Sequence, residues 1–286
     1  MIDNLRITVL VENTVRAANL LGEHGLAFWI EADGHQILFD TGQGKVLQHN
    51  AKCLEIPLDA TEMVLISHGH YDHTGGLKDL LDKVDQIDCY LHPAALEQKY
   101  HREKKSPNRS IGILDVDEHL LRKRTQKIIW TRLQTSLLDG IHLTGEIPRR
   151  NNFEDTGGPF YLDKYCIVPD PMLDDQALYI ETAAGLVVLL GCAHAGVVNT
   201  LDYIAELTGR ARVYAVLGGM HLAHATPTRL EATIATLKRY GVQKVGTAHC
   251  TGIRATSYLW SKLPGKCFEC SAGSVFAIGN GTKNIA

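Results

Sequence analysis

Three histidines and an aspartate stand close together in the chain, directly after an apolar run. Residues 63–67 have the composition of a short buried strand, and His68, His70, Asp72 and His73 follow it at once. Imidazole nitrogen and carboxylate oxygen are ligands that Zn²⁺ and similar ions prefer. Packing gives no reason for so many polar side chains at a strand end, so this cluster predicts a metal site.

Two further apolar runs end in the same way. Residues 186–190 lead into Gly-Cys-Ala and then His194, and residues 244–248 lead directly into His249. Functional side chains of layered α/β folds gather at strand ends. With the cluster at 68–73 present, His194 and His249 are predicted to complete the ligand set.

Two other strand ends carry polar side chains. Asp40 ends the run 36–40 and is predicted to orient a metal-bound histidine or a ligand from behind. His221 follows Gly-Gly-Met at the end of another apolar run, where metal ligation, a substrate contact and a turn cap all remain open. A place near the substrate is preferred for His221.

The remaining histidines have no such context. They are interpreted as ordinary residues, with His92 expected to be buried: His24, His35, His49, His92, His101, His119, His142 and His224. Cys267 and Cys270 have the spacing of a metal or redox pair, but no partner pair exists elsewhere, so they are interpreted as two thiols near a strand.

Composition favours a single enzyme-sized domain over residues 1–286. Of these residues, 45% are hydrophobic, which supplies a substantial core. The formal net charge of −3 does not favour a general nucleic-acid or membrane-surface binder. The first residues lack a signal-peptide pattern, no apolar run approaches the ~18 residues of a membrane span, and seven scattered cysteines favour reduced thiols in a cytoplasm.

Periodicity predicts strands and helices in alternation, especially in the C-terminal half. The expected strands cover residues 5–11, 26–32, 36–40, 63–67, 177–181, 186–190, 213–217, 243–248 and 271–278. The expected helices cover residues 77–84, 197–207 and 229–240. This order favours helices layered on sheets.

A basic segment interrupts this order at about residues 99–132. It holds ten Lys or Arg residues. One interpretation is a solvated insertion, and the other is a basic flap that closes over an anionic substrate.

The spacing His68-x-His70-x-Asp72-His73, with Asp40 upstream and His249 far downstream, resembles the metallo-β-lactamase superfamily. The resemblance covers nearly the whole chain. It implies an α/β fold, an αββα sandwich of two mixed sheets flanked by helices, with one or two metal ions at the sheet edge. Zn²⁺ is the expected ion, and Mg²⁺, Mn²⁺ or Fe remain open.

A narrower resemblance rests on a set of motifs. They are residues 38–42 (LFDTG), 68–76 (HGHYDHTGG), 144–149 (TGEIPR) with Phe153 and Glu154, 174–178 (DDQAL), 191–199 (GCAHAGVVN), 218–222 (GGMHL) and 249–252 (HCTG). Together they resemble the 7,8-dihydropterin-6-methyl-4-(β-D-ribofuranosyl)aminobenzene 5′-phosphate synthase group. That group implies a transferase that joins a dihydropterin methyl diphosphate to a ribofuranosylaminobenzene phosphate and releases diphosphate.

One departure from the superfamily pattern concerns the ligand between two metals. Many members have a histidine before the strand pair and a bridging aspartate after it. Here Asp174, Asp175 and Gln176 lie near the first position and Cys192 at the second. His194 is predicted to replace the missing histidine, and Cys192 either bridges or no bridge exists, so the number of metals stays open.

The preferred function is therefore a metal-dependent enzyme for a phosphate- or diphosphate-bearing small molecule. Arg149, His221, Thr251 and Arg254 are the predicted substrate contacts, because guanidinium groups match phosphate oxygens; Arg150 is a further candidate. Asp72 is predicted to bind metal or to take a proton.

The alternative is a metal-dependent hydrolase of an ester, lactone or phosphodiester. A flavo-diiron protein is disfavoured, because such proteins normally have a glutamate among the first ligands and position 70 is a histidine. A purely non-catalytic binding module is disfavoured by the intact ligand set. No nucleic-acid or membrane partner is expected, and a homo-oligomer remains open.

Overall fold

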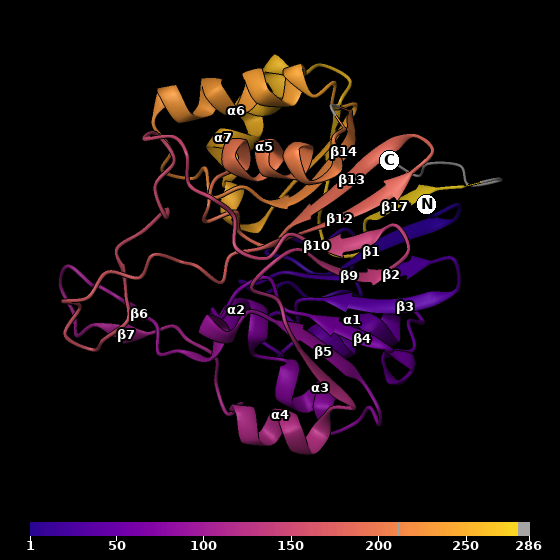
Figure 1. Cartoon of the computed structure of the whole chain (residues 1–286), viewed down its shortest axis with the longest axis vertical. Helices are drawn as coiled ribbons and strands as arrows, with labels where there is room; N and C mark the ends of the chain where they lie inside the picture. The colour runs from indigo at the N-terminus through magenta and orange to yellow at the C-terminus, as the bar shows by residue number, and fades with distance from the viewer. Residues whose placement is uncertain (211, 280–286) are drawn as a thin grey trace.

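Two seven-stranded mixed sheets pack face to face in the computed structural model, which describes residues 1–210 and 212–279 (Figure 1). The N-terminal sheet runs, in spatial order, β17 (Val275–Ile278), β1 (Leu5–Val11), β2 (Ala27–Ala32), β3 (His35–Phe39), β4 (Met63–Leu65), β5 (Asp88–Leu91) and β8 (Lys127–Trp130). The C-terminal sheet runs β16 (Cys267–Glu269), β15 (Lys244–Ala248), β14 (Val213–Gly219), β13 (Gly185–Leu190), β12 (Ala177–Thr182), β10 (Ile141–Leu143) and β9 (Thr135–Leu138).

Helices cover the outer face of each sheet, so the predicted αββα sandwich is confirmed (Figure 1). The C-terminal sheet carries α5 (Val197–Thr208), α6 (Pro227–Arg239) and α7 (Ile253–Lys262). The N-terminal sheet carries α1 (Leu47–Cys53), α3 (Leu77–Leu81) and α4 (Glu118–Arg124), and α2 (Tyr71–Thr74) lies between β4 and α3. Single turns of 3₁₀ helix cover Leu58–Ala60, Pro93–Leu96 and His249–Thr251. Across the described ranges, no helix is long and apolar enough to cross a bilayer.

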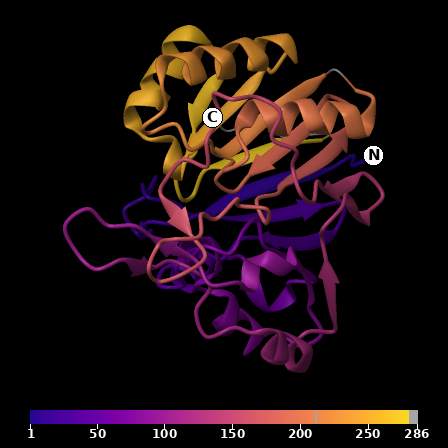
Figure 2. The same cartoon turned by 60° about the vertical axis from the view of Figure 1, so that its left-hand side comes forward.

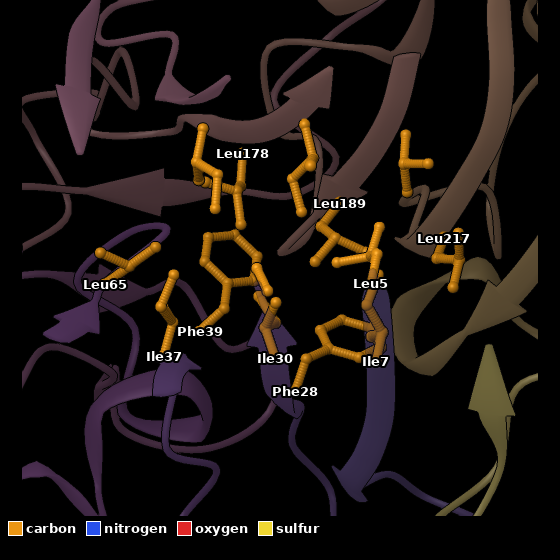
Figure 3. Close-up of a cluster of buried hydrophobic side chains, with 14 of the residues drawn as sticks. Leu5, Ile7, Phe28, Ile30, Ile37, Phe39, Leu65, Leu178, Leu189 and Leu217 are labelled. Carbon is orange, nitrogen blue, oxygen red and sulfur yellow. The ribbon is translucent and has the colours of Figure 1, made fainter. Parts of the chain in front are cut away.

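Side-chain alternation along the strands explains why both faces of each sheet are covered. In β13, Val187 and Leu189 belong to the core between the sheets, whereas Val188 and Leu190 belong to the core beneath the C-terminal helices. Successive side chains of a strand point to opposite faces, so an unbroken apolar strand requires cover on both. Figure 3 shows Leu189 meeting the inter-sheet core around Phe39.

Parallel pairing brings the chemically important strand ends to one edge of the sandwich. β3 pairs in parallel with β4, and β13, β14 and β15 are parallel neighbours. The carboxyl ends of β3 and β4 are followed by Asp40 and His68, while those of the other three are followed by Cys192, His221 and His249. These residues from the two sheets lie close together where the sheets approach each other.

Gly191 permits this close approach. A Cβ atom at position 191 would lie 2.0 Å from the Ser67 hydroxyl oxygen and 3.2 Å from Asp40 Oδ2. Any side chain there would therefore push the end of β13 away from the loop that follows β4.

The basic segment, residues 99–132, is not a single insertion outside the sandwich, in contrast to the expectation from the sequence. β8 at its end pairs in parallel with β5, and Leu121 of α4 is fully buried in the N-terminal core. The part that leaves the sandwich is a small sheet of β6 (Tyr100–His101), β7 (Arg109–Ser110) and β11 (Phe160–Tyr161). Figure 2 shows the β6–β7 loop extending from the edge of the molecule.

Two other element boundaries differ from expectation. The helix expected over 77–84 ends at Leu81. The strand expected over 271–278 begins only at Val275, because the preceding Gly273 turns with a φ of 92°. Cys267 lies inside a strand of its own, β16, rather than beside one.

A buried ion triad ties the small sheet to the sandwich. Lys99, 1% exposed, places its ammonium 2.8 Å from Asp170 and 2.9 Å from Asp174. The second carboxylate oxygen of Asp174 accepts a hydrogen bond from the Gly69 amide at 2.7 Å. Burial alone would raise the pKa of Asp174, but the Lys99 charge outweighs it and lowers that pKa.

Replacing Lys99 with Met is expected to destabilise the protein by about 3–5 kcal/mol at neutral pH, because a buried carboxylate loses its counter-ion. The lowered pKa of Asp174 means that its stabilisation is complete above its unfolded-state pKa and disappears as pH falls through the folded-state value. The deficit of the variant should therefore shrink toward pH ~3, below the unfolded-state pKa of ~3.9. Urea unfolding at both pH values measures this, and Lys105→Met, at an exposed position, is the control. Equal stability of the two variants at neutral pH contradicts the role of the triad.

Candidate metal centre

The backbone turns sharply at the strand ends of this edge. Asp40, Ala193, His221 and His249 all have left-handed conformations, with φ values of 61°, 52°, 47° and 48°. Non-glycine residues rarely adopt positive φ, and clusters of them are typical of functional sites. The turns bring polar side chains from both sheets into one small volume.

Asp40 connects the first two strand ends. Its Oδ1 accepts a hydrogen bond from the Ser67 amide at 2.7 Å, and its Oδ2 accepts from the Ser67 hydroxyl and from His73 Nδ1, each at 2.7 Å. Although burial favours a neutral imidazole, the Asp40 carboxylate raises the pKa of His73 to about 9. His73 therefore presents Nε2 to the centre, where it lies 3.1 Å from Cys192 Sγ.

Hydrogen bonds orient the rings of three more histidines. The Ser67 hydroxyl proton is donated to Asp40, so His68 Nδ1 donates to the Ser67 oxygen at 2.9 Å. His194 Nδ1 donates to the Thr156 carbonyl at 2.7 Å, and His249 Nδ1 donates to Asn13 Oδ1 at 2.8 Å. In the His68 and His194 rings, Nε2 is left with a bare lone pair, whereas His249 Nε2 faces the Asp72 carboxylate at 3.2 Å.

These bare nitrogens face one another. His68 Nε2 lies 3.2 Å from His194 Nε2 and 3.0 Å from His70 Nδ1, and His70 Nε2 is buried without a hydrogen-bond partner. Burial holds the pKa of His68 and His194 well below the usual value and lowers that of His70 to about 3. The lone pairs of His68 Nε2 and His194 Nε2 repel each other at this distance, whereas a cation between them would satisfy both.

A second group of donors surrounds Asp72. Its Oδ2 lies 3.2 Å from both His24 Nε2 and His249 Nε2. Burial would raise the pKa of Asp72, but the hydrogen bonds from His24 and His249 lower it well below its usual value. Asp72 is therefore ionised at neutral pH and offers a carboxylate to a cation.

Cys192 lies between the two groups. One donor atom each from Cys192, His68 and His194 fall within 4.8 Å of one another, and so do those of Cys192, His73 and His249. Burial raises the pKa of the Cys192 thiol well above its usual value, and a bound transition metal would reverse that preference.

The donor set fits a transition-metal centre. Thiol, imidazole and carboxylate donors converge. Hydrogen bonds fix the orientation of several of the imidazoles, and His70 Nε2 is buried without a hydrogen-bond partner. The groups that could hold ions are His68, His70 and His194 on one side and Asp72, His73 and His249 on the other, with Cys192 between them.

The structure places Arg149 behind the centre, not in a substrate contact as expected. Its guanidinium donates to the backbone carbonyls of His194 at 2.6 Å and Glu154 at 2.9 Å. Glu154 in turn accepts from the amides of Val198 and Asn199 at the start of α5. Arg149 therefore positions the loop that carries His194.

The other predicted substrate residues also lie elsewhere. Thr251 is fully buried, and its hydroxyl accepts from the Met220 amide at 3.0 Å. Arg254 is an exposed residue of α7 that does not line the pocket described below, and Arg150 pairs with Glu206 on the surface at 2.6 Å. Of the predicted set, His221 alone lines that pocket.

A pocket of about 410 Å³ opens over the donors. His70, Asp72, Cys192, His194 and His249 form part of its lining. Its remaining walls come mainly from the small sheet and neighbouring loops, with Tyr71, His101, Arg109, Phe160 and His224 among them.

An aromatic side chain covers the imidazoles in this pocket. The Phe160 ring centroid lies 5.0 Å from that of His70 and 5.2 Å from that of His194. Arg109 lies over the Tyr71 ring, with its guanidinium carbon Cζ 5.6 Å from the ring centroid. Its Nη1 donates to the Tyr71 hydroxyl at 3.2 Å. The small sheet thus supplies both an apolar surface and a cation.

Several of these residues were not predicted from the sequence. His24 was interpreted as ordinary, yet it contacts Asp72, and His101 and His224 line the pocket. Cys250 follows His249 in the HCTG motif, where adjacency to a predicted ligand was the available signal. Arg109 belonged to the basic segment, but nothing in the sequence distinguished it from the other nine basic residues there.

Comparisons with known proteins agree with this architecture. A family model described as the metallo-beta-lactamase superfamily matches residues 21–203. The chain is 31% identical to 7,8-dihydropterin-6-methyl-4-(beta-D-ribofuranosyl)-aminobenzene-5′-phosphate synthase of Methanocaldococcus jannaschii over 96% of this chain and 97% of the relative. It is also 31% identical to Tm1679, a solved metal-dependent hydrolase of the beta-lactamase superfamily, with a TM-score of 0.82 over 96% of this chain and 100% of the other. The fold alone is shared with YhfI of Bacillus subtilis, with 14% identity and a TM-score of 0.59 over 96% and 99% of the two chains.

Replacing His68 and His70 together with Ala should remove most of the bound transition metal, since two converging imidazoles are lost. Elemental analysis of the purified protein measures this, with circular dichroism to verify folding. His119→Ala, on the exposed surface of α4, is the control and should keep its metal. Full metal content in the double variant would contradict the assignment of His68 and His70 as metal ligands.

Replacing Asp40 with Asn should weaken metal affinity about 10–100-fold, the usual effect of losing a carboxylate behind a metal-bound histidine. The amide keeps the size of the side chain but removes the charge that orients His73. Competition with a chromophoric chelator measures the affinity, and Asp59→Asn, at an exposed position, is the control. Unchanged affinity in Asp40→Asn is the contrary outcome.

Proposed function

Because this chain belongs to the metallo-beta-lactamase superfamily, we propose that it is an enzyme that uses its metal centre on a phosphate- or diphosphate-bearing small molecule. The preferred reaction is that of a dihydropterin–ribofuranosylaminobenzene phosphate synthase, a transfer that releases diphosphate. The observation that carries this proposal is the composition of the pocket over the metal donors.

That pocket combines cationic and aromatic surfaces. The Arg109 guanidinium is held by the Tyr71 hydroxyl and lies 3.6 Å from Glu103, yet its side chain remains 54% exposed and able to meet a ligand. Guanidinium forks match phosphate oxygens, and the imidazoles of His101 and His224 line the same pocket.

Phe160 suits the other half of such a substrate. Its ring lies beside the metal-facing imidazoles, and an aromatic face at this position can stack on a flat heterocycle or a benzene ring. A pterin diphosphate and an aminobenzene ribose phosphate each carry both features, a ring and an anionic group.

The chain's own residues would orient and stabilise the reaction. Zn²⁺ is the expected ion, held by His68, His70, Asp72, His73, His194 and His249 with Cys192, and when bound it would polarise diphosphate oxygens as a Lewis acid. Arg109 would neutralise charge on the diphosphate as the C–O bond breaks, its electron pair passes to the leaving oxygen, and the aminobenzene component forms a new bond to the same carbon.

Asp72 is the candidate acceptor for the proton that leaves the aminobenzene component. Its lowered pKa keeps it ionised at neutral pH, and it lines the pocket. Arg149 and Asp40 would act indirectly, because they position His194 and His73.

A metal-dependent hydrolase is the second candidate. It is favoured by the likeness to Tm1679, a metal-dependent hydrolase of the beta-lactamase superfamily. Its substrate would be an ester, a lactone or a phosphodiester. An uncharged ester or lactone would have less need of the Arg109 cation.

We also expect a cytoplasmic location. All seven cysteines are free thiols, which fits a reducing compartment.

A substrate panel separates the two functions. The metal-loaded protein is given a dihydropterin methyl diphosphate with the ribofuranosylaminobenzene phosphate, and in parallel a phosphodiester and an uncharged lactone. Diphosphate release that requires both partners supports the synthase. Efficient lactone turnover without inhibition by inorganic diphosphate would promote the hydrolase.

Replacing Arg109 with Ala should weaken inhibition by inorganic diphosphate about fivefold or more, as expected for a charge-assisted contact of roughly 1 kcal/mol in a half-open pocket. Metal content should not change, because Arg109 does not contact the donors. The matched control is Arg122→Ala, which removes a basic residue of α4 paired with Glu118. Equal inhibition constants in wild type and Arg109→Ala would exclude the phosphate contact.

A further inference from the structure

Three soft donors follow three neighbouring parallel strands on the C-terminal side of the centre. Cys192 lies after β13, His221 after β14 and Cys250 after β15. One donor atom of each lies within 4.8 Å of the other two. All three residues line the pocket, so an ion could reach them from solvent.

One nitrogen of the His221 ring has no hydrogen-bond partner among the described residues. Its Nε2 lies 3.1 Å from the Gly157 carbonyl and donates to it, which leaves Nδ1 as a lone pair. Nδ1 is buried and has no hydrogen-bond partner. A buried polar atom of this kind is costly unless a ligand or ion satisfies it.

Local backbone geometry aims Cys250 and His221 toward each other. His221 has a φ of 47°, and its amide donates to Cys250 Sγ at 3.3 Å. Gly219 leaves the space that the thiol occupies, because a Cβ there would lie 2.7 Å from Cys250 Sγ.

We propose that Cys192, His221 and Cys250 form a further metal-binding position, next to the imidazole–carboxylate centre and sharing Cys192 with it. Two thiolates and an imidazole are the ligands of a thiophilic ion such as Zn²⁺ or Co²⁺, and they do not suit Mg²⁺. Binding would release the thiol protons and satisfy His221 Nδ1. The assignment holds whichever substrate the enzyme takes.

Absorption of the Co²⁺-substituted protein tests this position without an activity assay. Thiolate ligands give a charge-transfer band in the near ultraviolet that imidazoles and carboxylates do not give. Cys250→Ser should lose about half of that band, because one of two thiolate ligands is removed. It should also bind fewer Co²⁺ ions at saturation, while the visible bands from the imidazole-held ions persist. Cys53→Ser, a partly exposed thiol of α1, is the control and should keep the full band.

An unchanged band in Cys250→Ser would overturn the proposal and leave Cys192 as the sole thiolate ligand. His221→Ala leaves both thiols in place, and a full band with unchanged metal content in that variant would equally overturn it.

Alkylation of the wild-type protein gives a test that needs no variant. With Zn²⁺ bound, Cys250 should resist iodoacetamide, and chelation should expose it, as measured by mass spectrometry of the peptides. Mg²⁺ in place of Zn²⁺ should give no protection. Equal labelling of Cys250 with and without chelator counts against the site.

Discussion

The Asp40 carboxylate holds in place the strand ends and side chains that form the functional edge of the molecule. It accepts three hydrogen bonds, from the amide and hydroxyl of Ser67 and from His73 Nδ1. These bonds join the ends of β3 and β4 to α2 and determine which nitrogen of His73 faces the centre. Because the Ser67 hydroxyl gives its proton to Asp40, it must accept from His68, so the same carboxylate also sets the tautomer of that ring.

Comparable supports act elsewhere around the centre. Arg149 holds the carbonyl of His194, and Asn13 holds Nδ1 of His249. Asp174 accepts the Gly69 amide while Lys99 neutralises its charge. Within the described residues the neighbouring Asp175 forms no salt bridge, and burial raises its pKa to about 7 while its Oδ2 accepts the Ala195 amide. The donors are thus fixed before any ion arrives, which lowers the cost of assembling the site.

The strand ends and the small sheet have different roles because they occupy different positions at the centre. The strand ends carry the donors, whereas the small sheet of β6, β7 and β11 carries Arg109 and Phe160 over them. Loops outside the sandwich can vary without disturbing the core, so substrate choice in this fold resides mainly in such segments. The soft donors around Cys250 lie between the two regions, on the pocket wall formed by strand ends β13, β14 and β15.

The sequence by itself determined the superfamily, the layered α/β sandwich and the kind of chemistry, because strand periodicity and the His68–His73 spacing are local patterns. It placed most of the C-terminal strands and helices within a few residues. Only the tertiary structure decided that Arg149 contacts the His194 carbonyl, that His24 and Cys250 lie beside the candidate metal donors, and that Arg109 lines the pocket. These contacts join residues dozens of positions apart, and they depend on strand register and on which way a side chain leaves its turn, which no local pattern encodes.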